Sequence, residues 1–218
     1  MLMIDSKDKD IRKSVIYIIS HIIGADFKLL KEGQQHPLRQ QLTNDGTIAK
    51  MIQLYKDKEN KNIDFKISEI IAHILKASEL NADSNVEIIQ LFKEKTRFDE
   101  LALIAENPAN HEAILSNYFV KKLFQYEIIS LQSLNLTIPL LKFGSYNTKK
   151  LVILAIKQKV EILKSDQYLD KQAHESNYLT KEKKQIHIKA KIAFALIRWV
   201  EGMIEEEGDY EEIDAKQL

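Results

Sequence analysis

Apolar residues recur at intervals of three and four along this chain, and this spacing constrains the fold more than any other feature. In an α-helix such residues stack on one face, whereas a strand requires strict alternation. Isoleucine favours strands, but propensity is weaker evidence than spacing, so we predict an all-α protein. The pattern is strongest in four sets, namely Ile11, Val15, Ile18, Ile19 and Ile22; Ile63, Ile67, Ile70, Ile71 and Ile74; Val152, Ile156, Val160 and Leu163; and Ile186, Ala190, Ala193, Ile197, Val200 and Ile204.

Short polar breaks separate these apolar segments. The sequence NDGT at 44–47 predicts a helix end followed by a new helix, with Gly46 in the left-handed conformation. The sequence NPAN at 107–110 predicts a second joint, in which Asn107 caps the new helix and Pro108 is its first residue. Proline is tolerated there because the first helical N–H has no partner within the helix.

The helical segments show internal similarity. Residues 41–55 align with residues 113–127, which lie 72 positions further on, twice a period of 36. Residues 85–92 occupy the same place in a weaker copy between them. The alignment superposes Leu42 on Ile114, Ile48 on Val120, Met51 on Leu123 and Ile52 on Phe124, and the longer apolar helices that follow the three copies are expected at 63–77, 97–106 and 131–143. A period near 36 indicates a helical repeat protein.

The stretch ENPANHEAILSNYFVKKLF at 106–124 resembles an armadillo repeat. The matching features are Asn107, Pro108, Asn110 and Ile114 in a short first helix, then Val120, Leu123 and Phe124 in a second helix, while Gly46 and Ile48 match the Gly-x-Ile turn of the family. The resemblance implies an α-solenoid of three-helix units whose third helices line a concave groove. It covers about 36–143, and a HEAT-like or other helical solenoid is the alternative.

We therefore predict a single armadillo-like solenoid domain over 1–204, with three to four repeats centred on 36–143. Stacked repeats bury apolar faces that no single repeat can bury alone, and the terminal units need a cap. Residues 149–204 are expected to form a C-terminal helical hairpin cap that contains an exposed insertion at 165–180. Residues 205–218 are acidic and are expected to be a flexible tail.

The composition excludes several classes of protein. Lysine and arginine total 32 residues and aspartate and glutamate also total 32, so the formal net charge is zero. Binding to nucleic acid or anionic membranes requires a basic excess, so we expect neither partner. The chain has no cysteine, which excludes a disulfide framework and a thiolate zinc site. It shows no signal-peptide pattern and no uninterrupted apolar run of about 18 residues, which predicts a cytoplasmic protein.

No pattern in the chain predicts catalysis. The six glycines form no phosphate-binding loop, and the six histidines form no metal-ligand pair at helical spacing. Adjacent carboxylates, as at Asp99 and Glu100, are typical of a solvated helix surface. We therefore expect no enzyme activity, no metal and no cofactor, and an enzyme with an unrecognised site is the competing hypothesis.

Polar residues on the expected third helices are candidates for contacting a partner. They are Glu69, His73 and Lys76 on the helix at 63–77, and Gln132, Asn135 and Lys142 on the helix at 131–143. If the armadillo resemblance holds, this row faces the groove, and Asn135 matches the asparagines that hold a peptide backbone in that family. The alternative is an ordinary solvated helix face with weak local ion pairs.

The C-terminal part of the chain has an uneven charge distribution. Residues 181–191 are basic and residues 205–214 are acidic, so the basic segment is either a docking site for an acidic partner or a local charge excess. Trp199 lies beside the core face of this helix, and we predict that it is buried.

The function expected from the sequence is a non-catalytic scaffold that binds a segment of another protein in a concave helical groove. The alternative is a structural subunit or fragment of a larger helical assembly, which would expose wide apolar patches.

Overall fold

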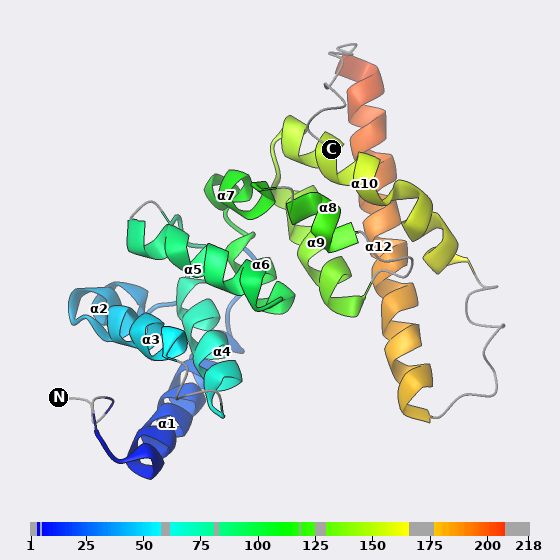
Figure 1. Ribbon diagram of the computed structural model, residues 1–218. Coiled ribbons are helices and arrows are strands. Elements are labelled where there is room, and N and C mark those ends of the chain that lie inside the picture. The colour runs from blue at the N-terminus through cyan, green and yellow to red at the C-terminus, as the bar shows by residue number, and fades with distance from the viewer. Residues whose placement is uncertain are drawn as a thin grey trace. The chain divides into compact units, whose positions relative to one another are not determined.

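A computed structural model describes residue 4 and residues 6–57, 62–80, 83–117, 119–124, 130–165 and 177–207. Every regular element in this part of the chain is a helix, and none of the described residues forms a strand (Figure 1). The all-α prediction is therefore confirmed. No helix among the described residues combines the length and the apolar character that crossing a bilayer would require.

The chain divides into two compact units, Met1–Asn107 and Pro108–Leu218. The boundary falls inside the NPAN joint, where a short 3-10 helix begins at Pro108 as the sequence predicts. The side chain of Asn107 donates to the carbonyl oxygen of Ala77 at 3.3 Å. The single domain expected over 1–204 stays a prediction, and each unit is described by itself.

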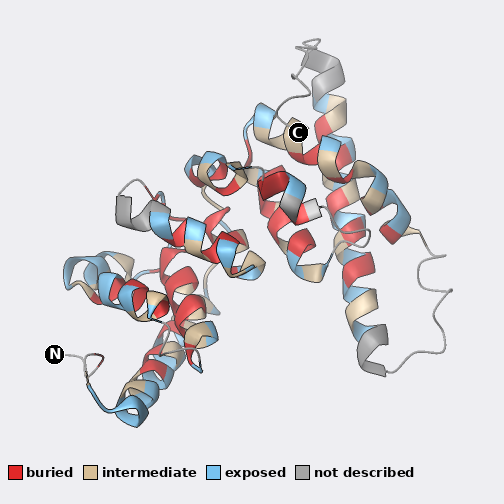
Figure 2. Ribbon diagram, in the orientation of Figure 1, coloured by how far each residue is buried: buried red, intermediate tan, exposed pale blue. Residues whose placement is uncertain are grey.

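The N-terminal unit contains a row of three packed helices. Helix α4 packs against α1 on one side and α6 on another, while α3 packs on α4, α2 on α3 and α5 on α6. Buried residues run along α4 (Figure 2). All five predicted isoleucines, of which Ile63 directly precedes the helix, have less than 4% of their surface exposed. The elements are α1 (Lys9–Phe27), α2 (Arg39–Asn44), α3 (Thr47–Lys56), α4 (Asp64–Leu75), α5 (Asp83–Glu94) and α6 (Phe98–Ile104).

The turn before α3 has the predicted geometry. Gly46 has φ +75°, in the left-handed region that glycine enters without steric cost. The first helical residue, Thr47, donates its backbone N–H to Asp45 Oδ1 at 2.9 Å. Ile48, Met51 and three further side chains of α3 are then buried, so this turn aims the buried face of α3 at the core.

Helix α1 buries a different face from the predicted one. Its N-cap Asp8 accepts the backbone N–H groups of Asp10 and Ile11. The buried residues are Ile16, Ile19 and Ile23, and Ile19 is the one buried residue of the predicted set. The exposed members of that set are Ile11, Ile18 and Ile22. The prediction was wrong because isoleucines and valine occupy two adjacent faces of this helix, and periodicity alone does not choose between them.

The C-terminal unit is built around three longer helices. Helix α9 packs against α10 and α12, α10 and α12 pack together, and α8 packs on α10. Ser130 caps α9 by accepting the N–H of Ser133, and Ser145 caps α10 by accepting the N–H of Thr148. The elements are η3 (Pro108–Asn110), α7 (His111–Leu115), α8 (Phe119–Phe124), α9 (Leu131–Phe143), α10 (Tyr146–Lys164) and α12 (Asn177–Glu207).

Most of the predicted core of this unit is confirmed. The predicted faces of α10 and α12 are buried along their described lengths, and Ile204 falls outside the described side chains. Trp199 is 55% exposed, so its predicted burial was wrong. Helix α12 starts at Asn177, inside the expected insertion, and runs to Glu207, beyond the expected helix end. The rest of the insertion and the tail from 208 onwards lie outside the described residues.

Candidate functional site

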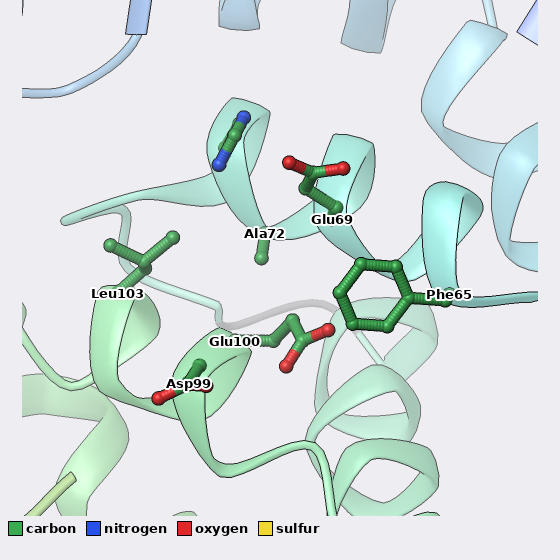
Figure 3. A pocket seen from close by; sticks show the side chains of 7 residues that line it. Phe65, Glu69, Ala72, Asp99, Glu100 and Leu103 are labelled. Atoms are coloured by element: carbon green, nitrogen blue, oxygen red, sulfur yellow. The ribbon is translucent and has the colours of Figure 1, made fainter. Parts of the chain in front are cut away.

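A pocket lies between α4 and α6 in the N-terminal unit. Its volume is about 200 Å³. The lining residues from α4 are spaced three or four positions apart, so they share one face of that helix. This face lies beside the isoleucine stripe that forms the core. Figure 3 shows the seven lining residues, which are Phe65, Glu69, Ala72, His73, Asp99, Glu100 and Leu103.

A buried carboxylate stands at the wall of the pocket. Glu100 is only 7% exposed, and its Oε1 accepts a hydrogen bond from the hydroxyl of Ser68 at 2.8 Å. That hydroxyl also lies 2.8 Å from the carbonyl oxygen of Phe65. Buried charges need such partners because desolvation is costly. The adjacent carboxylates of the sequence are therefore not both solvated surface, because Glu100 is built into the α4–α6 interface.

Two further carboxylates lie closer to solvent. Glu69 is partly exposed and pairs with Lys66 at 2.5 Å, three residues earlier on α4. Asp99 is exposed in the first turn of α6, where the helix dipole favours a negative charge. The pocket thus has carboxylates from both helices, at Glu69, Asp99 and Glu100.

His73 is held in its neutral form beside these carboxylates. Its ring stacks on that of Phe27, with the centroids 3.7 Å apart and an interplanar angle of 6°. Burial lowers the pKa of His73 from 6.5 to about 4, although the nearby Glu69 carboxylate favours protonation. At neutral pH the imidazole therefore adds no positive charge to offset the carboxylates of the pocket.

An exposed aromatic ring forms another side of the pocket. Phe65 is 60% exposed, whereas the isoleucines of the same helix are deeply buried. The guanidinium of Arg97 lies 5.1 Å from the centroid of the Phe65 ring, within the range of a cation–π contact. The pocket therefore combines an apolar surface with carboxylates, a pairing suited to a cation on an aliphatic stem.

The residues that line the pocket are of types that can recognise a ligand through apolar and charged contacts. No group of three or more histidine, aspartate or glutamate side chains among the described residues is placed to hold a metal ion. The titratable groups that line the pocket are three carboxylates and one imidazole of lowered pKa, and the Ser68 hydroxyl donates to the Glu100 carboxylate at the pocket wall.

The structure brings together two of the three candidates on α4. Glu69 and His73 both line the pocket, but Lys76 does not. Helix α4 ends at Leu75, and Lys76 has φ −48° and ψ 131°, outside the helical region. Its ammonium turns into the protein, where it pairs with Glu106. Lys76 is 4% exposed, so the prediction that it lies in an accessible row was wrong.

The other three candidates lie on α9, in the C-terminal unit. Gln132 and Lys142 are exposed, and Asn135 is partly buried. The Lys142 ammonium lies 5.5 Å from the centroid of the Phe143 ring. A continuous groove that joins these residues to Glu69 and His73 stays a prediction.

Sequence reasoning missed most of the pocket. Phe65 gave a usable signal, because it is an aromatic residue four positions before Glu69 on the polar face of an amphipathic helix. Phe27 gave none, because its stacking on His73 joins residues 46 positions apart. No family model, characterised protein or solved structure matches the chain significantly.

Proposed function

We propose that the protein is a non-catalytic binding module whose α4–α6 pocket receives a lysine or arginine side chain from a segment of another protein. The observation that carries the proposal is that an exposed aromatic ring, Phe65, lines the same pocket as the carboxylates of Glu69 and Asp99. The aliphatic stem of the incoming residue packs on Phe65 and Leu103, and its cation meets the carboxylates. Neutral His73 adds no positive charge to the pocket at neutral pH, and the incoming cation joins Lys66 as a second partner of Glu69.

The helix order of the N-terminal unit supports the armadillo-like part of the proposal. Helices α1, α4 and α6 pack in a row, with α2 and α3 leading into α4 and α5 leading into α6. Successive units of a helical solenoid pack in this way, and the row gives an extended binding surface. In this scheme α9 is a third helix of the C-terminal unit, and Gln132, Asn135 and Lys142 are its candidate contact residues.

A matched pair of fluorescent peptides tests the recognition of a cation. One peptide carries a central arginine and the other carries citrulline, which has a similar shape but no charge. We expect the arginine peptide to bind about tenfold more tightly, because an ionic hydrogen bond in a partly buried site contributes about 1.5 kcal/mol or more. Fluorescence anisotropy measures both affinities.

Neutral variants of the pocket locate the effect. Glu69→Gln with Asp99→Asn is expected to abolish the preference for arginine over citrulline. The matched control is Glu94→Gln with Glu112→Gln, since both residues are exposed and lie outside the pocket. Equal binding of the two peptides by the unaltered protein, or an equal loss of preference in both variants, would refute the proposal.

A second candidate function rests on helix α1. Ile11, Ile18 and Ile22 are 41%, 59% and 56% exposed on one side of this helix, which favours the structural-subunit alternative. Ile18→Ser with Ile22→Ser is expected to raise the solubility of the isolated chain. Unchanged solubility and a monomer at all concentrations, measured by light scattering, would argue against this candidate.

A further inference from the structure

Helix α12 carries a second apolar face besides its core face. We name this face the α12 stripe, which comprises Ile188, Ile192, Ala195, Trp199 and Met203. Its four large side chains are between 39% and 55% exposed, and Ala195 is also exposed. The spacing of three and four residues places the stripe along one side of the helix, over about 22 Å at 1.5 Å per residue.

The stripe lies on roughly the opposite side of α12 from its buried residues. Those include Ile186, Ala190, Ala193 and Ile197, against which α9 and α10 pack. A helix at the surface of a globular unit has one apolar side, whereas a helix that is apolar on two sides belongs between two layers. The C-terminal unit supplies one layer, and the stripe remains exposed.

A basic edge runs beside the stripe. Lys184, Lys191 and Arg198 recur every seven residues and are all exposed. Because seven residues make almost two turns, these cations keep nearly the same side of the helix. The Arg198 side chain is 69% exposed and lies 3.8 Å from Glu201, whose other oxygen is 2.6 Å from the Lys157 ammonium.

The other edge of the stripe adds no negative charge. It carries Gln185, Lys189 and Leu196. A partner that fits the whole surface therefore needs an apolar face of matching length together with acidic residues along one edge.

We propose that the α12 stripe is a docking site for an acidic amphipathic helix of a partner protein. That helix has about four turns, with apolar residues at intervals of three and four and aspartate or glutamate along the edge that meets the basic edge. Trp199 is the expected anchor, because tryptophan is enriched among the residues that dominate the binding energy of interfaces. The Lys149 ammonium, 5.2 Å from the ring centroid, contacts the Trp199 ring from α10.

The observations favour a protein partner over a membrane surface. The chain has a formal net charge of zero, which gives little general attraction to anionic lipid. A straight stripe along a single helix matches another helix in shape. The proposal does not depend on the α4–α6 pocket, which lies in the other unit.

Trp199 is the only tryptophan of the chain, so its fluorescence reports directly on the stripe. The probe is a designed helical peptide of about four turns, without tryptophan, with leucine on one face and glutamate on the adjoining edge. A second peptide replaces each glutamate with lysine. Vesicles of phosphatidylcholine and phosphatidylserine test the membrane alternative. We expect a blue shift of the emission maximum with the acidic peptide and none with the basic peptide or the vesicles.

A charge-reversal variant tests the basic edge. Lys184→Glu, Lys191→Glu and Arg198→Glu together are expected to weaken binding of the acidic peptide about tenfold or more, since three modest ion pairs are lost and each is replaced by a repulsion. The same variant is expected to bind the basic peptide, which also shows that it is folded. The matched control reverses Lys13, Lys28 and Lys50, which are exposed on or beside α1 and α3, and should leave binding unchanged.

Each other outcome overturns the proposal in a defined way. A blue shift with vesicles and not with the acidic peptide assigns the stripe to a membrane. A blue shift that grows with protein concentration alone assigns it to a second copy of the chain. An emission maximum of the free protein that is already typical of a buried indole shows that the chain covers its own stripe. No response to any probe leaves the stripe without the proposed occupant.

Discussion

Replacing Lys76 with methionine is expected to remove much of the stability of the N-terminal unit. The Lys76 ammonium is buried, pairs with Glu106, and donates to the carbonyl oxygens of Lys31 at 2.9 Å and Gln34 at 3.4 Å. The same Glu106 oxygen accepts the N–H of Gly33 at 2.6 Å. One ion pair thus joins the end of α4, the chain after α6 and the loop after α1.

The magnitude follows from the charge that is left behind. Lys76→Met keeps Glu106 nearly buried with only the Gly33 N–H as a described partner of its Oε2. Removing one member of a buried ion pair costs about 3–5 kcal/mol, a large part of the roughly 5–15 kcal/mol that stabilises a typical domain. The double variant Lys76→Met with Glu106→Leu removes both charges and is expected to recover at least ~1 kcal/mol of that loss.

Urea denaturation followed by circular dichroism measures these differences as shifts of the midpoint at constant slope. The control is Lys66→Ala, which breaks the partly exposed pair with Glu69 and is expected to cost less than about 1 kcal/mol. The reasoning is refuted if Lys76→Met costs no more than the control. It is also refuted if the double variant is less stable than the single one.

Three further predictions concern glycines and a histidine. Gly144→Ala is expected to destabilise the protein by about 1–3 kcal/mol, because the added Cβ would collide with the Leu140 carbonyl oxygen. Gly202→Ala adds a Cβ that meets no atom within 4 Å, and it should stabilise the protein by about 1 kcal/mol. Thermal unfolding compares the two variants. Gly46→Ala is expected to destabilise by about 1 kcal/mol or more because of the positive φ, and equal stability in urea would contradict this. The lowered folded-state pKa of His73 contributes stability above pH 6.5, and this stability is lost as pH falls towards about 4. His73→Phe should flatten the dependence of the free energy of unfolding on pH in this range, which urea unfolding at each pH measures.

The sequence predicted most of the helices because their apolar residues lie on a single side. On α4, α10 and α12 the predicted core residues among the described side chains are buried. The turn at Gly46 and the joint at Pro108 were also predicted, because glycine and proline restrict the backbone in ways that need no tertiary context.

The predictions failed where two faces of a helix were both apolar. On α1 the chain buries Ile16 and Ile23 and exposes Ile18 and Ile22. The side on which α4 packs determines which of the two apolar faces of α1 is buried. Trp199 precedes the buried Val200, but one residue turns the helix by 100°, which carries the indole out of the core. Local spacing cannot supply the position of a neighbouring helix.

The pocket depended on contacts between residues far apart in the chain. Glu69 and His73 were chosen from their position on the polar side of α4, but Phe27, Asp99 and Leu103 join them through tertiary packing. Lys76 was misplaced because α4 ends one residue before it. A shift of one or two residues at a helix end changes which way a side chain points.

The exposed apolar residues form two kinds of surface, a single ring in a pocket and stripes along a helix. Helix α4, which packs between α1 and α6, has Phe65 as its one large exposed apolar side chain, and that ring lies beside carboxylates in a pocket sized for a single side chain. Helices α1 and α12 instead expose apolar residues over several turns, which fits contact with another helix. Substitutions in the pocket should therefore change which single residue is recognised, whereas substitutions in the α12 stripe should change whether a helix binds at all. A variant that altered both properties together would show that the two surfaces are coupled.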